Sequence, residues 1–443
     1  MTAMNWTSLL STKRLHHRAD SPEPTRSAFE QDFDRIIFSH PFRRLQDKTQ
    51  VHPLPEHDFV HTRLTHSLEV SSVGRSLGRR VGEVILDRHA ELKNNFTSHD
   101  FGTIVASASL AHDLGNPPFG HSGEEGLSDF FRHHAGQQYK PFFAESEWAD
   151  LTSFEGNAQG FRILNKPQYQ GLRLTVAALG AFTKYPCPSV FAQRDVSRKS
   201  QKKFGFFQTE KNLFDAVATE LGLIKQHDHV WGRHPLAFLV EAADDICYNI
   251  IDLEDGCRLG LVSANDTIEL LAGILREDFN PEKAARIKST DEKIGVLRAL
   301  AIGKLISDVV AVFLTNEAAI LEGKFDNALT DLGSYTKELK QIIDISVEKI
   351  YRARHVVEIE SAGFEVLPGL LGEFIKAAEH AVKKNQAKKY ANLARLLPPE
   401  ALQTIQSNPE NVYLHLREVI DFISGMTDRH ALLLYRKIKG FQI

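Results

Sequence analysis

Four residues that lie far apart in the chain could together bind a metal ion: His66, the adjacent pair His112 and Asp113, and Asp244. Two imidazoles and two carboxylates form a mixed nitrogen and oxygen set that suits Mn²⁺, Mg²⁺, Fe²⁺ or Zn²⁺, and these ions can activate water for phosphoester hydrolysis. The His112-Asp113 pair lies between apolar residues, where a buried carboxylate needs a metal or a cationic partner. The four residues are therefore candidate ligands of one divalent ion.

The spacing around Asp244 carries further information. Asp244, Tyr248 and Asp252 follow one another at intervals of four residues, so on a helix they share one face, which could border a polar pocket. In the alternative arrangement Asp245 and Asp252 lie on a solvated face while Tyr248 packs in the core. The spacing fits both arrangements.

Helical periodicity predicts the elements that carry the histidines. Apolar residues recur at helical spacing over 62–85, which contains His66. The same pattern covers 99–113 and stops at a Gly-Asn-Pro-Pro sequence, so His112 and Asp113 are expected to close a helix.

The remaining segments also predict helices. Pro235 stands at a plausible first-turn position of a segment that is apolar on most faces and carries Asp244, so we expect a buried helix there. Few stretches alternate as strands do, and the predicted fold class is mainly α, with a helical core and an extended helical C-terminal part. Further amphipathic segments cover 293–314, 339–360 and 370–384.

Composition limits the class of protein. The chain has 443 residues, of which 42% are hydrophobic and 25% charged, as is usual for a folded globular protein. The formal net charge of −4 does not favour polyanion binding by the whole surface, so any phosphate site must be built locally. Three cysteines without CxxC spacing (Cys187, Cys247 and Cys257) predict neither a disulfide framework nor a zinc ribbon and fit a reducing cytoplasm. We expect no secretion signal and no membrane span.

The predicted domain organisation is continuous, because no repeat, low-complexity tract or flexible linker divides the chain. Residues 1–28 are expected to form a polar, mobile or loosely docked N-terminal arm. Residues 29–260 would form the catalytic core. Residues 261–443 would form a helical region that packs on this core and contributes to oligomerisation.

Several motifs resemble one known family. The run HDLGNPPFGHSGE at 112–124 is similar to the signature of the bacterial dGTPase family, which consists of HD-domain relatives of the vertebrate dNTP triphosphohydrolase. The matching segments span about residues 30–260, and the C-terminal ISGMTDRHALLLYRK resembles the closing helix of the family more loosely. The other similar segments are FRRLQDKTQV at 42–51, RLTHSLEV at 63–70, FEGNAQGFR at 154–162, TKYP at 183–186, KKFGFF at 202–207 and EAADDICYNIIDLEDG at 241–256.

This resemblance assigns roles to single residues. It makes His66, His112, Asp113 and Asp244 the ligands of the HD metal, which is the set that the chemistry alone suggests. His121 and Glu124 would form the acid/base pair at the scissile phosphate, with the carboxylate holding the histidine in one tautomer. The purely structural alternative for this pair is a helix N-terminal cap beside a solvated carboxylate.

Residues for phosphate and sugar binding come from the same comparison. Arg63 lies three residues before His66 on the same helical face and could clamp a phosphate, although a surface ion pair is the alternative. Lys184, Tyr185 and Lys203 resemble phosphate-contacting positions. Gln50 and Asp252 resemble the positions that hydrogen-bond the sugar 3′-hydroxyl, with the Tyr248 ring beneath the deoxyribose as a gate against a 2′-hydroxyl. Asp245 departs from the pattern, because vertebrate relatives have a lysine there.

The resemblance implies a metal-dependent dNTP triphosphohydrolase that prefers dGTP, uses one ion (Mn²⁺ or Mg²⁺ ahead of Fe²⁺ or Zn²⁺) and releases deoxynucleoside and triphosphate. It also implies a homo-oligomer, and a nucleotide activator or single-stranded nucleic acid is a further candidate partner. Two alternatives stay open. One is an HD phosphodiesterase for cyclic nucleotides or alarmones, and the other is a nucleic-acid-binding scaffold with a vestigial site, for which the short basic stretches 75–80 and 198–203 would be the contact.

Overall fold

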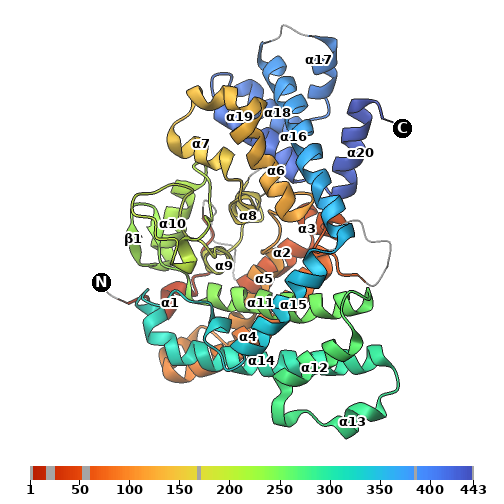
Figure 1. Ribbon diagram of the computed structural model, residues 1–443. Helices are drawn as coiled ribbons and strands as arrows, with labels where there is room; N and C mark the ends of the chain where they lie inside the picture. The colour runs from red at the N-terminus through yellow and green to blue at the C-terminus, as the bar shows by residue number, and fades with distance from the viewer. Residues whose placement is uncertain (1–2, 16–24, 52–59, 167–170, 384–386, 442–443) are drawn as a thin grey trace.

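The computed structural model describes residues 3–15, 25–51, 60–166, 171–383 and 387–441, and these residues are mostly helical (Figure 1). The mainly α fold expected from the sequence is thereby confirmed. The single strand pair in these ranges is β1 (Lys225–His227) with β2 (Val230–Trp231), which run antiparallel.

The α-helices before the strand pair are α1 (Trp6–Leu9), α2 (Ala28–Ile37), α3 (His40–Arg44), α4 (Arg63–Arg88), α5 (Ser98–Ala111), α6 (Gly120–His133), α7 (Glu145–Thr152), α8 (Gly156–Asn165), α9 (Val176–Phe182) and α10 (Lys211–Leu221). Those after it are α11 (Pro235–Arg258), α12 (Ala264–Leu275), α13 (Pro281–Arg286), α14 (Thr290–Leu321), α15 (Thr336–Ile345), α16 (Arg354–Lys383), α17 (Lys388–Ala394), α18 (Pro399–Ser407), α19 (Val412–Ser424) and α20 (Asp428–Lys439).

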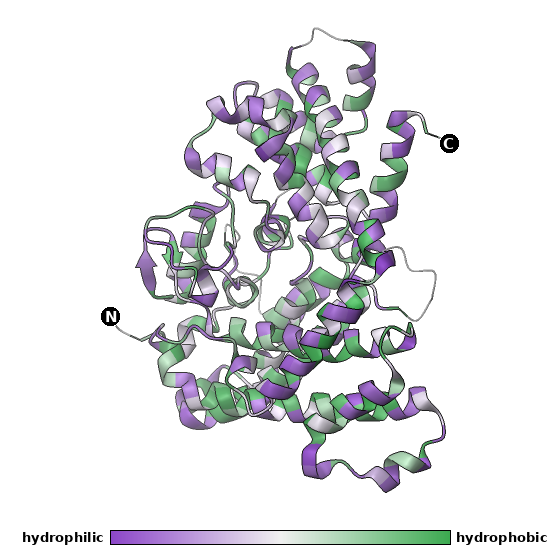
Figure 2. Ribbon diagram, viewed as in Figure 1, coloured by the Kyte–Doolittle hydropathy of each residue, from purple (hydrophilic) through white to green (hydrophobic). Residues whose placement is uncertain are grey.

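Helices α4, α5 and α11 pack against one another and carry the four candidate ligands. The predicted helices at 62–85, 99–113 and from Pro235 match these three within a few residues. α4 and α5 approach closely because a Cβ atom at Gly78 would lie only 2.6 Å from the carbonyl oxygen of Phe101. In Figure 2 the apolar colouring is concentrated on the packed helices of the interior, in keeping with the burial of α5 from Phe101 to Ala111.

Two apolar cores lie on either side of the candidate site. The first joins the buried faces of α4, α5, α11, α12 and α14. The second joins α6, α16, α19 and α20, which occupy the other end of the molecule in Figure 1. Residues that face the space between these cores can therefore come from segments far apart in the chain.

The N-terminal segment differs from the expected mobile or loosely docked arm over its described residues, 3–15. Met4, Trp6 and Leu9 are buried in the first core, and the Trp6 indole donates to Glu317 Oε1 at 3.1 Å. The segment docks because three apolar side chains recur within six residues, a pattern that its polar average conceals. The rest of the expected arm includes residues 16–24, which lie outside the described part of the chain.

The predicted amphipathic segment 339–360 is not one α-helix. α15 ends at Ile345, a π-helical turn covers Ser346–Tyr351, and α16 begins at Arg354. α16 then continues through Pro368, so residues 370–383 of the predicted segment 370–384 form its second half, and residue 384 lies outside the described residues. Burial of its apolar face against α6 and α19 outweighs the helix-breaking tendency of the proline. No helix in the described ranges has the length and apolar character needed to cross a bilayer.

Candidate active site

The four candidate ligands come together at the junction of α4, α5 and α11. His66 Nε2 lies 3.1 Å from Asp244 Oδ1, and His112 Nε2 lies 3.6 Å from the same oxygen and 3.5 Å from Asp113 Oδ1. His66, His112 and Asp113 offer ligand atoms that all lie within 4.8 Å of one another. Residues separated by up to 178 positions thus converge on one point.

The hydrogen bonds around these residues favour metal binding. His112 Nδ1 is 2.6 Å from the carbonyl oxygen of Ser109, which can only accept, so Nδ1 carries the proton and Nε2 keeps its lone pair. Burial acts to raise the pKa of Asp244, but the opposing effect of His112 and His66 is larger and lowers this pKa to about 2. The two imidazoles and two carboxylates form a mixed nitrogen and oxygen set that fits a divalent cation.

Arg63 and Asn116 hold Asp113 from two sides. Arg63 Nη1 donates to Asp113 Oδ2 at 2.7 Å and to Gln50 Oε1 at 3.3 Å, while Asn116 Nδ2 donates to Asp113 Oδ1 at 2.5 Å. Against the effect of burial, the Arg63 and His112 charges hold the pKa of Asp113 well below its usual range. Arg63 is thus the cationic partner that the buried carboxylate needs, and its surface-pair alternative is wrong because Arg63 is only 6% exposed.

A cavity of about 420 Å³ opens beside this junction. Of the thirteen predicted site residues, His66 is buried and does not line the cavity, and neither does Asp252. The other eleven line it: Gln50, Arg63, His112, Asp113, His121, Glu124, Lys184, Tyr185, Lys203, Asp244 and Tyr248. This volume is within the usual range for small-molecule sites.

His121 and Glu124 face the cavity from the first turns of α6, but no hydrogen bond joins them among the described contacts. Glu124 Oε1 instead accepts from the backbone N–H of Gly156 at 2.7 Å. The expected tautomer-fixing bond is therefore absent because the start of α8 takes the carboxylate. Burial and the charge of Glu155 raise the pKa of Glu124 to about 7, whereas burial and the Lys203 charge lower that of His121. The Glu124 carboxyl can therefore bind and release protons near neutral pH, and the lowered pKa of His121 favours its neutral imidazole.

Two lysines form the cationic side of the cavity. Lys184 Nζ lies 3.3 Å from Glu241 Oε1, and Lys203 Nζ lies 3.3 Å from Glu155. Arg233 is a second partner of Glu241, at 2.8 Å. Each lysine therefore keeps a carboxylate partner at the wall while its side chain remains accessible from the cavity.

A pair of stacked tyrosines also lines the cavity. The rings of Tyr248 and Tyr351 stack with centroids 5.4 Å apart, and Tyr351 Oη donates to Asp252 Oδ2 at 2.9 Å. Asp252 is only 3% exposed, so its predicted direct contact with a sugar has to be revised to support of Tyr351. The alternative with Tyr248 in the core and Asp252 solvated is also wrong, because Tyr248 is 36% exposed.

Sequence reasoning missed four residues that line or shape this cavity: Asn116, Glu155, Glu241 and Tyr351. Glu155 lies inside the FEGNAQGFR segment, which marked the region without giving the glutamate a role. Tyr351 is 99 residues from Asp252, and no spacing in the chain predicts their contact. Asp245, the departure from the family pattern, accepts a hydrogen bond from Thr330 Oγ1 at 2.7 Å and does not line the cavity.

Comparison with known proteins agrees with this geometry. Residues 63–144 match the HD domain, and residues 331–437 match the phosphohydrolase-associated domain. The His-His-Asp group thus lies within an HD-domain protein of the phosphohydrolase class.

Full-length relatives define the family more closely. A deoxyguanosinetriphosphate triphosphohydrolase-like protein of Synechocystis is 43% identical, over 99% of this chain and 100% of the relative. A protein of the same description from Pseudomonas aeruginosa is 40% identical over 99% of both chains. The deoxyguanosinetriphosphate triphosphohydrolase of Yersinia pestis is 31% identical over 95% of both chains. The chain belongs to the deoxyguanosinetriphosphate triphosphohydrolase-like family of HD-domain hydrolases.

Proposed function

We propose that the protein hydrolyses deoxynucleoside triphosphates at the α-phosphate, with dGTP as the preferred substrate, and releases deoxynucleoside and triphosphate. The observation that carries the proposal is one cavity of about 420 Å³ lined by a His-Asp ligand group, three cationic side chains and two stacked tyrosines. These groups match the three parts of the substrate's reacting half: the scissile phosphate, the anionic chain and the sugar. Family membership supports the same reaction.

In this proposal His66, His112, Asp113 and Asp244 hold one divalent cation, with Mn²⁺ or Mg²⁺ preferred. When bound, such an ion supplies Lewis-acid polarisation and a more acidic water molecule. His121, whose lowered pKa favours the neutral imidazole, accepts a proton from the attacking water, and the imidazolium formed in this way donates the proton to the leaving 5′-oxygen. Glu124, whose pKa is about 7, can bind and release protons on the same side of the cavity. Arg63, adjacent to Asp113, binds a phosphate oxygen.

The lysines bind the remaining charge of the triphosphate. Lys184 and Lys203 lie 3.3 Å from their glutamate partners, so both carry a positive charge that can turn toward an anionic ligand. Tyr185 lies beneath Lys184, whose Nζ is 5.8 Å from its ring centroid, and limits the orientations of that lysine. Without substrate, Glu241 and Glu155 balance the charges of the two lysines. A polyanionic substrate can pair with the same lysines, so the site selects such a substrate.

The tyrosine pair selects the sugar. The Tyr248 ring lies against Tyr351, and the hydrogen bond to Asp252 fixes the position of Tyr351. A 2′-hydroxyl pressed against these rings would lose water without gaining a partner, which disfavours ribonucleotides. Gln50, whose amide oxygen is bound by Arg63, is the residue proposed to contact the 3′-hydroxyl.

Product analysis tests the proposal. The purified protein is incubated with each dNTP and each NTP, with Mn²⁺ or Mg²⁺, and the products are separated by ion-exchange chromatography. We expect deoxynucleoside and tripolyphosphate, fastest from dGTP. Formation of deoxynucleoside monophosphate and pyrophosphate, or no turnover of any dNTP, would contradict the reaction, whereas a faster reaction with another dNTP would contradict only the base preference.

Assembly and regulation remain predictions of the family resemblance. We expect a homo-oligomer, because exposed apolar side chains such as Val357 and Phe364 lie on α16. Analytical ultracentrifugation measures the assembly state. Adding a second nucleotide or a single-stranded oligonucleotide during turnover tests for an activator.

A further inference from the structure

The turn that leads into α6 has an uncommon backbone conformation. Phe119, the N-cap residue of α6, has a φ of 63°, and the next residue, Gly120, has a φ of 58°. A phenylalanine in the left-handed region is strained, and such residues persist only where their surroundings hold them. The next residue in the chain is His121, so the conformation of this turn decides where the proposed proton-transfer group lies.

Two contacts hold Phe119 in place. Its ring is only 2% exposed and lies in the second core, where Phe119 Cβ is close to Gly363 of α16. Its backbone N–H donates to Asp428 Oδ1 at 3.1 Å. The side chain of an N-cap residue usually accepts a hydrogen bond from the first turn, but a phenylalanine cannot, so the anchoring of this turn depends on groups from elsewhere.

Asp428 is the first residue of α20, more than 300 positions from Phe119, and is 1% exposed. Its other carboxylate oxygen accepts from the N–H of Thr49 at 3.0 Å and from the Thr49 hydroxyl. One carboxylate therefore joins two separate segments. One segment continues to Gln50 and the other to His121, and both of these residues line the cavity.

A buried lysine links the same segments by a parallel route. Lys48 Nζ donates to the carbonyl oxygens of Asn116 at 2.6 Å and Ser424 at 2.9 Å. Residues 48 and 49 are thus tied both to the turn that follows Asp113 and to the junction of α19 and α20. Together these bonds make the C-terminal helices part of the frame of the catalytic cavity.

We propose that Asp428, on the C-terminal helix α20, is a positioning residue for the proposed reaction: its carboxylate fixes the turn before His121 relative to the segment that carries Gln50. The inference rests on the proposed function for its catalytic consequence and on the three hydrogen bonds for its geometry. Asp428 does not line the cavity. It sets the distance between two groups that would contact opposite parts of a substrate.

The chemistry of the three donors explains why a carboxylate is required. Two backbone N–H groups can only donate, and they bind different oxygens of Asp428. An asparagine has one acceptor oxygen, so in either orientation its NH₂ group faces one of these N–H donors. Asp428→Asn keeps the shape of the side chain and leaves at least one of the two backbone N–H groups without its acceptor, and Asp428→Ala removes all three bonds.

The experiment combines steady-state kinetics with hydrogen–deuterium exchange. For Asp428→Asn we expect kcat for dGTP to fall about 100-fold, since a displacement of about 1 Å in a reacting group has an effect of this size, while KM changes less than about threefold. Exchange should accelerate in peptides that cover residues 116–123 and stay unchanged in α5. Arg429→Ala is the matched control, because Arg429 is the next residue of α20 and forms only an exposed ion pair, at 3.6 Å, with Asp47.

The outcomes separate the possible failures. A wild-type kcat in Asp428→Asn and Asp428→Ala, or exchange that accelerates equally throughout the chain, would overturn the positioning role. If the wild-type protein cleaves no dNTP, the proposed function fails on its own. The exchange of residues 116–123 then still decides whether Asp428 holds the turn. Should Asp428→Ala fail to fold, Asp428→Asn carries the comparison.

Discussion

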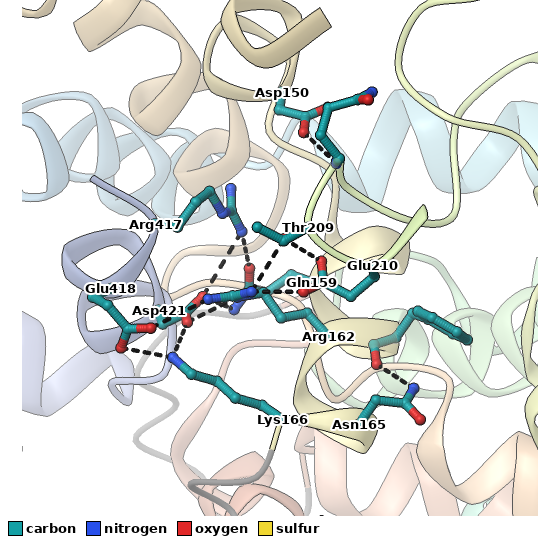
Figure 3. Close-up of polar contacts among 12 residues, drawn as sticks. Asp150, Gln159, Arg162, Asn165, Lys166, Thr209, Glu210, Arg417, Glu418 and Asp421 are labelled. Atoms are coloured by element: carbon teal, nitrogen blue, oxygen red, sulfur yellow. Dashed lines mark hydrogen bonds and ion pairs between the residues drawn. The ribbon is translucent and has the colours of Figure 1, made fainter. Parts of the chain in front are cut away.

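Charged side chains are buried in two regions of this protein, and the two regions differ in what completes their pairing. One is the cavity between α4, α6 and α11. The other is a network between α8 and α19, shown in Figure 3, in which Arg162 lies at the centre. Arg162 donates to Asp421 at 2.9 Å and to Glu210 at 2.6 Å, and lies 3.4 Å from Glu418.

The network contains three cations and three carboxylates: Arg162, Lys166 and Arg417 with Glu210, Glu418 and Asp421. Its charges cancel within the protein, and the Arg417 guanidinium also stacks on Phe207, 3.6 Å from the ring centroid. Lys166, Glu418 and Asp421 also line a cavity, of about 460 Å³, but they pair with one another and with Arg162. In the active-site cavity two histidines and two carboxylates instead converge on one point beside the open space. Pairing that is complete without a ligand stabilises the fold, and pairing that a ligand completes serves binding.

The largest effect that this comparison predicts is a loss of turnover when one of the candidate metal ligands at the cavity is replaced. His112→Ala should lower kcat/KM for dGTP by about 10³-fold or more, beyond the 10- to 100-fold typical for residues behind a metal ligand. The protein should stay folded, because His112 makes only one short hydrogen bond, to Ser109. Coupled nucleoside-release assays, bound-metal analysis and circular dichroism measure the three quantities.

Asp113→Ala should give the same kinetic result. Wild-type turnover in a folded double variant of His112 and Asp113 would mean that the reaction takes place elsewhere in the molecule. Loss of the fold in both variants would mean that the cavity charges are as structural as those of the network, and the contrast between the two regions would not hold.

Replacing a residue of the buried network should lower the unfolding free energy and leave kcat nearly unchanged. Arg162→Ala leaves Asp421, Glu418 and Glu210 buried with fewer cations, and removal of one partner from a buried pair costs about 3–5 kcal/mol of unfolding free energy. Urea denaturation followed by circular dichroism measures the change. The kcat of the molecules that remain folded should stay within about threefold of wild type.

The control for this change is an exposed ion pair. Arg354 and Glu358 lie 2.6 Å apart on α16 with side chains 91% and 58% exposed. Arg354→Ala should cost less than about 0.5 kcal/mol. An equal cost for both variants would show that burial does not distinguish them, and a selective loss of kcat in Arg162→Ala would place the network within the catalytic machinery.

The residues of the cavity could be predicted from the sequence better than those of the buried network around Arg162. The four candidate metal ligands lie in segments with helical periodicity, which can be read locally because a helix presents residues at fixed intervals. The helices that carry these ligands were predictable for the same reason. Lys184, Tyr185 and Lys203 were assigned by the family resemblance. The docked N-terminal segment was not, since three apolar side chains among polar neighbours have little periodicity.

Contacts between distant segments were beyond such reasoning. Asp428 binds Thr49 and Phe119, and Asp421 binds Arg162, across more than 250 residues. The role of Tyr351 depends on a π-helical turn, which no helical period predicts. His121 and Glu124 were found by resemblance, but the hydrogen bond from the backbone N–H of Gly156 to Glu124 was not predicted.

A third prediction concerns Asp150, which lies beside the network (Figure 3) and accepts hydrogen bonds from Ser189, Tyr413 and the Gln208 amide. Burial raises its pKa from 3.8 to about 6, although these bonds act in the opposite direction. The folded state therefore holds the proton more tightly than the unfolded chain. The stabilisation is fully present below about pH 4 and is lost as the pH rises through about 6.

Asp150→Asn removes this dependence. Relative to this variant, the wild-type unfolding free energy should fall by up to about 3 kcal/mol between pH 4 and pH 7, from the shift of about two units. Urea titrations at several pH values measure the difference. A difference that is constant with pH would mean that Asp150 titrates normally despite its burial, and a rising wild-type curve would reverse the sign of the argument.

The smallest effect is expected at the aromatic wall of the cavity. Tyr248→Ala should lower the ratio of kcat/KM for dGTP to that for GTP by about tenfold, because a 2′-hydroxyl could then keep a water partner in the space that the ring leaves. Tyr351→Phe is the matched change, since it keeps the stacked ring, 5.4 Å from Tyr248, and removes the hydroxyl that binds Asp252 and Tyr248. It should alter KM more than sugar selectivity.

Neither variant should lower the unfolding free energy as far as Arg162→Ala, since Tyr248 is already 36% exposed. If the ratio is unchanged in Tyr248→Ala but falls in Tyr351→Phe, the discrimination between sugars lies in the hydrogen bonds of the Tyr351 hydroxyl and not in the shape of the ring.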